Sequence, residues 1–100
     1  MYKINISVTL LHSSKTNAEH LMKKIDRERH MVAHSSVYPV HHIRQYEDVR
    51  KNKVFEFTFE SRNNDFDDAE KRVTGILKKL FIRTGVSEED IRIDDAIFEL

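Results

Sequence analysis

The stretch of sequence that decides the fold spans residues 53–60 and reads Lys53-Val54-Phe55-Glu56-Phe57-Thr58-Phe59-Glu60. Apolar and polar side chains alternate along this stretch, and alternation with a period of two is typical of a strand that is buried on one face. Phenylalanine recurs on the apolar side, and aromatic side chains suit the pleated, half-buried surface of a sheet. Residues 53–60 therefore predict a strand near the middle of a sheet.

Three further strands are expected. Residues 3–10 also alternate, and they predict a second central strand. Residues 37–46 are interpreted as a strand that contains Pro39, which lacks a backbone donor and therefore favours the edge of a sheet. Residues 48–52 would form the hairpin turn after it. The last strand is expected over residues 91–100, where Asp94, Asp95 and Glu99 are compatible with a second edge.

Two stretches between these strands have the spacing of amphipathic helices. Thr16 and Glu19 have the form of a capping box, so the first helix should begin there and extend to about residues 30–34. Asp65 with Asp68 can cap the start of the second helix. Gly85 is placed to end that helix in a left-handed conformation.

This order of elements predicts one α+β domain over residues 1–100. With right-handed crossovers it gives a ferredoxin-like βαββαβ plait, a four-stranded antiparallel sheet of order 4-1-3-2 with two helices on one face. A different α+β arrangement, in which residues 35–52 form a loop, stays open. The expected core consists of Ile4, Ile6, Val8, Leu21, Ile25, Phe55, Phe57, Val73, Leu77 and Leu80.

The composition indicates a soluble protein. Apolar residues make up 39% of the chain and charged residues 34%, enough for a core under a largely charged surface. Cysteine is absent, which excludes disulfides, thiolate metal sites and a cysteine nucleophile. No apolar run approaches the roughly 18 residues of a membrane span, and residues 1–5 do not resemble a signal peptide. We therefore expect a cytoplasmic protein that does not bind membranes.

Two His-x-Ser triplets, His12-Ser13-Ser14 and His34-Ser35-Ser36, are similar to the paired motifs of the two-histidine phosphoesterases. That resemblance implies one histidine as general base and the other as general acid across a cyclic phosphate. The chain is short for that family, however, and neither triplet lies within an alternating apolar strand. We therefore expect no catalytic activity, and a small phosphoesterase is the least favoured alternative.

Other histidines could be considered as metal ligands. His30 and His34 could share one face of the first helix with Asp26, and His41 and His42 are adjacent. Neither set has a recognised metal-binding spacing. With two glycines in the chain, a glycine-rich phosphate loop is also excluded. We expect no metal and no cofactor.

Residues 53–59 resemble the aromatic strand of an RNA recognition motif, but the glycine and small residue beside the aromatics are missing. The phenylalanines share one face, and Glu56 and Glu60 on the other would repel phosphate. The formal net charge is zero, so nucleic acid binding would need a local patch. A phosphate-contacting module that uses Arg44, Arg50, Lys51 and Lys53 is the disfavoured alternative.

The remaining hypothesis is a non-catalytic protein-binding or self-associating regulatory module. The edge strand over residues 37–46 can extend the sheet of a partner, and tyrosine and arginine are favoured at binding hot spots. The basic edge and the acidic last strand could meet in a homodimer, or the edge could bind a host enzyme as an inhibitor from a phage or mobile element. The expected partner-binding residues are Tyr38, His41, His42, Arg44, Tyr46, Arg50, Lys51 and Lys53.

Overall fold

The computed structural model describes residues 2–11, 18–34, 40–62 and 64–100, with the backbone alone for Ala18, residues 28–34 and residues 40–43. The helices are α1 (Ala18–His34), α2 (Phe66–Arg83) and the short 3-10 helix η1 (Glu88–Asp90). The strands are β1 (Tyr2–Leu10), β2 (Val40–Glu47), β3 (Lys53–Ser61), β4 (Ile91–Ile93) and β5 (Ile97–Glu99).

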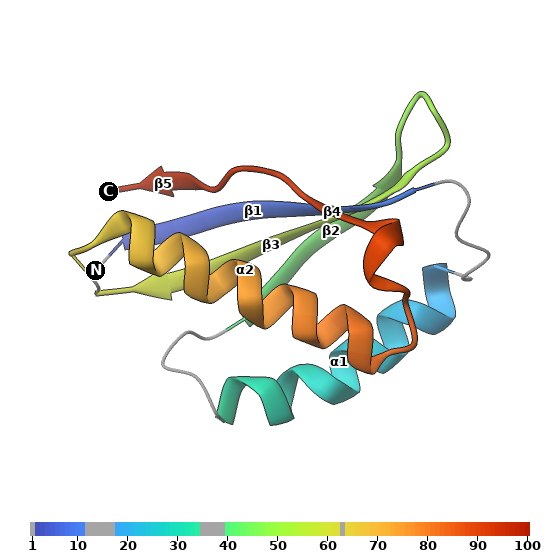
Figure 1. The fold of residues 1–100 in the computed structure, drawn as a ribbon, viewed down its shortest axis with the longest axis horizontal. Coiled ribbons are helices and arrows are strands. Elements are labelled where there is room, and N and C mark those ends of the chain that lie inside the picture. Colours follow the sequence, from blue (N-terminus) through green and yellow to red (C-terminus); the bar gives the residue numbers. More distant parts are fainter. Residues whose placement is uncertain (1, 12–17, 35–39, 63) are drawn as a thin grey trace.

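The strands form one antiparallel sheet with the order β2-β3-β1-β4, and β5 also pairs with β1. Both helices lie beneath the same face of the sheet (Figure 1). Taken from β4, this path has the predicted order 4-1-3-2, but the sheet has five strands rather than the four predicted. The structure is therefore an α+β arrangement of two α-helices on a five-stranded antiparallel sheet.

The core lies between the sheet and the helices. Ile6 of β1 stands opposite Phe57 of β3, and both are buried. The ring of Phe81 from α2 lies 5.5 Å from that of Phe55 and 6.0 Å from that of Phe57, in edge-on geometry. The ten residues expected in the core are all buried, which confirms that prediction. The phenylalanines of β3 thus face the helices rather than solvent.

The ends of α2 follow the sequence signals. The Asp65 side chain accepts a hydrogen bond from the backbone N–H of Asp68 at 3.1 Å, as a helix cap does. Gly85 has a φ of 99°, and the N–H groups of Gly85 and Val86 bind the carbonyls of Ile82 and Phe81. Both predicted caps of α2 are confirmed, whereas the one expected at Thr16 lies outside the described residues.

The single last strand predicted over residues 91–100 is wrong. Val8 pairs with Ile93 and Asn5 pairs with Ile97, so three residues of the last segment stand opposite two of β1. Such an extra residue breaks the ladder as a β-bulge does. The break is held from the helix side, because the Glu70 carboxylate of α2 accepts a hydrogen bond from the Ala96 N–H at 2.8 Å. Asp94 and Asp95, expected in an edge strand, lie in this break.

The extra residue changes which side chains face the helices. Phe98 stands opposite the buried Ile4, and its ring stacks on Phe66 of α2 at 4.8 Å. Ile97 stands opposite Asn5 and is 66% exposed. A continuous ladder from β4 would have reversed these two positions, because a shift of one residue moves a side chain to the other face.

Strand β2 is described over Val40–Glu47, and this part of it is irregular. Residues 37–39 of the predicted strand, including Pro39, lie outside the described residues. The pairing with β3 shifts between His42 and Arg44, so Ile43 is the extra residue of a bulge. The alternative in which residues 35–52 form a loop is wrong for 40–47. Within the described residues, neither α1 nor α2 is long and apolar enough to cross a membrane.

Candidate functional site

Strand β2 forms one edge of the sheet and carries much of the surface expected to bind a partner. Among the described strands it pairs with β3 alone. Figure 1 shows the hairpin between β2 and β3 projecting from the body of the sheet, away from both helices. Arg44 and Tyr46 stand opposite Glu56 and Val54, on the sheet face that the helices do not cover, which we call the open face.

Arg44, Tyr46 and Glu56 form one connected cluster on the open face. The Arg44 guanidinium donates two hydrogen bonds to the Glu56 carboxylate, from Nε at 2.9 Å and from the second nitrogen at 3.0 Å. Its Cζ also lies 4.9 Å from the centre of the Tyr46 ring, within the range of a cation–π contact. Arg44 and Tyr46 remain accessible, because the Arg44 side chain is 65% exposed and Tyr46 is 43% exposed.

These contacts set the charges of the cluster. The hydrogen bond from Arg44 lowers the pKa of the Glu56 carboxyl below its usual value, and a hydrogen bond from the Tyr46 hydroxyl acts in the same direction. The carboxylate in turn raises the pKa of Arg44. Both side chains are therefore charged at neutral pH. The bidentate geometry holds Arg44 in a defined orientation rather than leaving it as a mobile cation.

The hairpin turn is built around Asp48. Its Oδ1 accepts hydrogen bonds from the backbone N–H groups of Arg50 and Asn52, both at 2.9 Å. The bond from Asn52 is the main cause that lowers the pKa of the Asp48 carboxyl. The Lys51 N–H binds the Asp48 carbonyl at 3.0 Å, and Lys51 has a left-handed φ of 63°. The turn predicted over residues 48–52 is therefore confirmed, and it is a defined structure.

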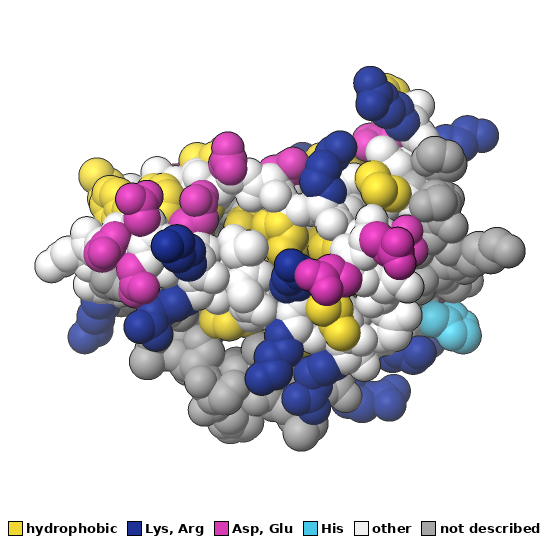
Figure 2. Space-filling view, in the orientation of Figure 1, with side chains coloured by type: hydrophobic (Ala, Val, Ile, Leu, Met, Phe, Trp, Pro, Cys, Tyr) yellow, Lys and Arg dark blue, Asp and Glu magenta, His cyan; other side chains and the backbone are white. Residues whose placement is uncertain are grey.

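The tip of the turn presents one apolar and two basic side chains. Val49 is fully exposed, and Arg50 and Lys51 are exposed beside it. Figure 2 shows Lys and Arg side chains standing out at this end of the molecule. Lys53 begins β3 opposite Glu47 and is half-buried. We use the name hairpin surface for Arg44, Tyr46, Val49, Arg50 and Lys51.

The structure brings together part of the predicted partner-binding set. Arg44 and Tyr46 are in contact, and Arg50 and Lys51 share the turn that follows them. His41 and His42 lie in β2 opposite Thr58 and Phe57, with the backbone alone described. Tyr38 lies outside the described residues. The ion pair with Glu56 was not predicted, because it depends on the register of a strand whose sequence does not alternate.

The catalytic and metal-site hypotheses fall largely outside the described side chains. His12 lies outside the described residues, and the side chain of His34 is not described. The same is true of the His30 side chain, while Asp26 is exposed on α1. Over the described ranges, no group of three or more histidine, aspartate or glutamate side chains could hold a metal ion. The expectation of a non-enzyme stays a prediction.

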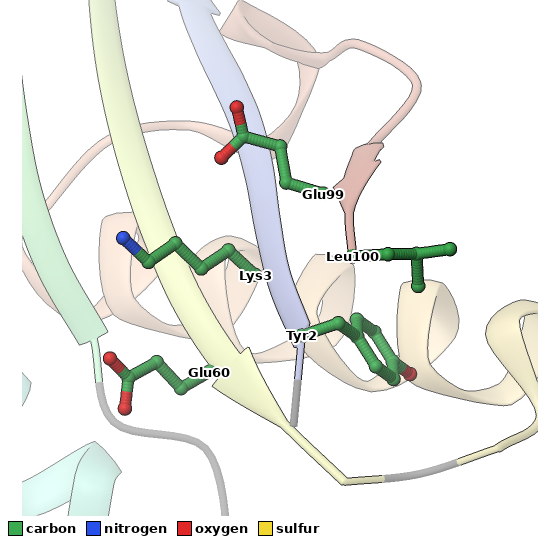
Figure 3. Close-up of a pocket in the computed structure, with 5 residues that line it drawn as sticks. All are labelled: Tyr2, Lys3, Glu60, Glu99 and Leu100. Atoms are coloured by element: carbon green, nitrogen blue, oxygen red, sulfur yellow. The ribbon is translucent and has the colours of Figure 1, made fainter.

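The open face along β1 carries mainly polar side chains, with the exposed Ile97 among them, and two hollows lie along it. One, of about 570 Å³, is lined by Tyr2, Lys3, Glu60, Glu99 and Leu100. Figure 3 shows Lys3 on the strand between those of Glu60 and Glu99, which stand opposite it in the two ladders. A second hollow, of about 660 Å³, continues along β1 past Asn5 and Ser7. The buried phenylalanines of β3 leave no ring of that strand on this face for base stacking.

Sequence reasoning also missed two features of the opposite edge of the sheet, where β5 lies. The stacked rings of Phe66 and Phe98 and the hydrogen bond from Ala96 to Glu70 hold β5 against α2. The partly buried apolar positions change from odd numbers at Ile93 to even numbers at Phe98, and this change was the signal that could have revealed the break in the last strand.

Comparison of the whole chain with models of known families, with curated proteins and with solved structures found no match.

Proposed function

We propose that this domain is a non-catalytic protein-binding module, and that the hairpin surface and the outer edge of β2 bind the partner. The observation that carries the proposal is the position of β2, which pairs with β3 on one side and ends in a projecting hairpin. The backbone groups on the other side of an edge strand can pair with an extended segment of another protein.

The side chains of the hairpin surface favour an acidic partner segment. Arg50 and Lys51 stand at the exposed tip, where they can attract carboxylates and raise the rate of association. Tyr46 and Arg44 are of the residue types that contribute most at protein interfaces. Their mutual contact and the ion pair with Glu56 fix both side chains before binding, which lowers the entropy cost of binding.

The β2 bulge limits how such a partner could pair. Residues 44–47 are in regular register with β3, and the irregularity at Ile43 lies immediately before them. A bulge bends and twists its strand, so a long flat partner strand fits poorly across it. The proposed partner segment is therefore short and lies along residues 44–47, beside the hairpin.

Two alternatives use the same surface. In a homodimer the basic hairpin would contact the acidic end of a second copy, where Asp94, Asp95 and Glu99 are exposed. In a nucleic acid complex Arg44, Arg50, Lys51 and Lys53 would contact phosphates, but Glu56 already holds Arg44 and would repel phosphate there. We favour the protein partner because the backbone groups at the outer edge of β2 can pair with an extended polypeptide, which nucleic acid cannot supply. That the domain is a regulator or an inhibitor from a phage or mobile element stays a prediction.

We also propose that the fold is a ferredoxin-like plait with a divided last strand. The support is the order of the elements, the antiparallel path β2-β3-β1-β4 and the placement of both helices on one face. This architecture serves many unrelated functions, so it adds nothing to the choice of partner.

The deciding experiment is affinity capture from the native host with three forms of the protein. The test variant is Arg44→Ala/Tyr46→Ala, and the matched control is Arg72→Ala/Ile82→Ala, which removes an ion-paired arginine and a similarly exposed apolar side chain from α2. We expect an acidic polypeptide to bind the wild type and the control, and to bind the test variant at least about tenfold more weakly.

Other results would contradict the proposal. Equal affinity of the test variant and the wild type would show that the surface is wrong. Captured material that is lost after nuclease treatment would favour the nucleic acid alternative. A wild-type dimer in light scattering, absent from the test variant, would favour self-association.

A further inference from the structure

The outer edge of β2 presents a specific set of backbone groups, and the hairpin turn shows which ones they are. The Asp48 N–H donates a hydrogen bond to the Asn52 carbonyl at 2.9 Å, so the backbone of Asp48 points toward β3. In an antiparallel ladder the backbone groups of successive residues point alternately toward the neighbouring strand and away from it. Gln45 and Glu47 therefore present their N–H and C=O groups at the outer edge, where no described strand pairs with them.

The opposite side of the sheet gives the same result independently. The Asp94 N–H donates to the Ser7 carbonyl at 3.0 Å, so Ser7 points its backbone groups away from β3. Glu56 stands opposite Ser7 and therefore directs its own groups toward β2, where Arg44 stands opposite it. Arg44 thus faces β3, and its neighbour Gln45 faces outward. Hydrogen bonds at two distant places of the sheet assign the same groups to the outer edge.

These directions determine how an antiparallel partner strand would meet β2. The partner residues opposite Gln45 and Glu47 would exchange both hydrogen bonds with them. The partner residue between these two would stand opposite Tyr46 in a non-hydrogen-bonded pair, where the side chains lie closer together. Tyr46 is 43% exposed on the open face. An apolar or aromatic partner side chain at this position would gain a cross-strand contact with the tyrosine ring.

The two basic parts of the hairpin surface differ in what they offer to a carboxylate. Arg44 already donates two hydrogen bonds to Glu56, so a second carboxylate beside it would lie close to the charge of Glu56. At the turn, Arg50 and Lys51 are exposed, and the Asp48 carboxylate accepts hydrogen bonds from the turn itself. The two cations outnumber this one carboxylate. Acidic partner residues therefore fit better beside the turn than beside Arg44.

We propose that the partner segment is an antiparallel strand in which an apolar residue stands opposite Tyr46 and acidic residues precede it in the sequence. This inference rests on the proposed function, because it describes the partner of the same edge. An antiparallel ladder is more stable per residue than a parallel one. In this direction, the partner residues before the apolar one extend past Glu47 toward Arg50 and Lys51. The residues after it lie beside Arg44 and the bulge.

The test uses two synthetic peptides with blocked ends and the same composition. The forward peptide has two aspartates, then threonine, phenylalanine and a run of threonines, and the reversed peptide has the opposite order. Amide hydrogen exchange of the whole protein is followed by NMR with each peptide. We expect the forward peptide to protect the amides of Gln45 and Glu47 and to leave that of Tyr46 unchanged. It should bind roughly threefold more tightly than the reversed peptide at low salt.

Matched variants separate the charges from the apolar contact. Arg50→Gln/Lys51→Gln should bind both peptides equally, whereas the control Lys23→Gln/Lys79→Gln removes the same charge from exposed positions on the helices and should keep the preference. Replacing the phenylalanine of the forward peptide by threonine should weaken binding to the wild type roughly threefold. The same replacement should have little effect with Tyr46→Ala, because the contact is already lost.

Equal affinity of the wild type for the two peptides, or tighter binding of the reversed one, overturns the proposed order and direction. Protection that misses Gln45 and Glu47 at millimolar peptide overturns the assigned backbone groups. The proposed function fails by a different result, namely a captured host polypeptide that binds Arg44→Ala/Tyr46→Ala as tightly as the wild type. The two failures are therefore distinguishable.

Discussion

The Arg44 guanidinium on β2 donates two hydrogen bonds, of 2.9 Å and 3.0 Å, to the Glu56 carboxylate on the neighbouring strand β3. This pair ties the edge strand β2 to β3 on the open face. Because the bonds favour the ionised carboxylate, the folded state lowers the pKa of Glu56. A group whose pKa is lower in the folded state stabilises the fold above its unfolded pKa, and this contribution is lost as the pH falls through the folded value.

The first prediction is therefore a pH-dependent difference between the wild type and Glu56→Gln. At pH 7 the wild type should be the more stable, and the difference should shrink below the usual carboxyl pKa of 4.5 as Glu56 is protonated. Urea unfolding between pH 7 and pH 3 measures it. In an Arg44→Gln background the same substitution should show little of this dependence. A difference that stays constant to pH 3 would contradict the pairing.

The second prediction concerns backbone strain in the hairpin. Lys51 has a φ of 63°, a conformation that glycine adopts freely and that costs other residues roughly 1–2 kcal/mol. Lys51→Gly should raise the free energy of unfolding by about 0.5–1 kcal/mol, after the greater freedom of glycine in the unfolded chain is subtracted. Arg50→Gly is the control and should not be stabilising. A less stable Lys51→Gly protein in urea unfolding would refute this.

A third prediction tests the shifted register of β5. Phe98 is half-buried and touches the rings of Tyr2 and Phe66, whereas its neighbour Ile97 is 66% exposed. Phe98→Ala should cost about 2–3 kcal/mol, below the range for a fully buried ring, and Ile97→Ala should change the stability by less than about 0.5 kcal/mol. Thermal and urea unfolding of both variants give the comparison. A larger loss of stability for Ile97→Ala than for Phe98→Ala would mean that the last segment pairs with β1 without the extra residue.

The fourth prediction separates the two faces of β3. Phe57 is fully buried against the helices, so Phe57→Ala should cost about 3–5 kcal/mol. Thr58 lies on the open face and donates a hydrogen bond to Asn5 Oδ1 at 2.8 Å, so Thr58→Ala should cost about 1 kcal/mol. Urea unfolding distinguishes these values. A similar loss of unfolding free energy for the two variants would contradict the burial of Phe57 in the core.

Strong periodic signals explain what could be predicted of the fold. In β1 and β3 a buried face and an open face alternate, and the alternation alone identifies Ile6 and Phe57 as core residues. The caps of α2 are local in sequence, since Asp65 binds the N–H of Asp68 three positions later. Structural features that depend only on residues close together in the chain can be predicted well from the sequence.

The remaining features depend on register and on contacts between distant segments. The bulge at Ile43 interrupts the alternation in β2, so the side chains of residues 40–47 do not follow one strand period of two. The pairing of Arg44 with Glu56 follows from that bulge. The packing of α1 against α2 brings Lys24 and Arg83 to one hollow, and no local pattern in the sequence predicts this. In the candidate site, the sequence predicted residue types and the hairpin turn but not these contacts.

The central place of β1 in the sheet has a kinetic consequence. Asn5 and Thr58 are bonded across 53 positions of sequence, and the other neighbours of β1 come from residues 91–99. These contacts can form only after large loops of the chain have closed, so the contact order is high for a chain of this size. The entropy lost when the loops close therefore adds to the folding barrier. In stopped-flow refolding we expect the helices to form early and the sheet to form on the order of milliseconds or later. We expect β5, which pairs with β1 through three residues, to dock after the transition state, so substitutions in β5 should mainly speed unfolding.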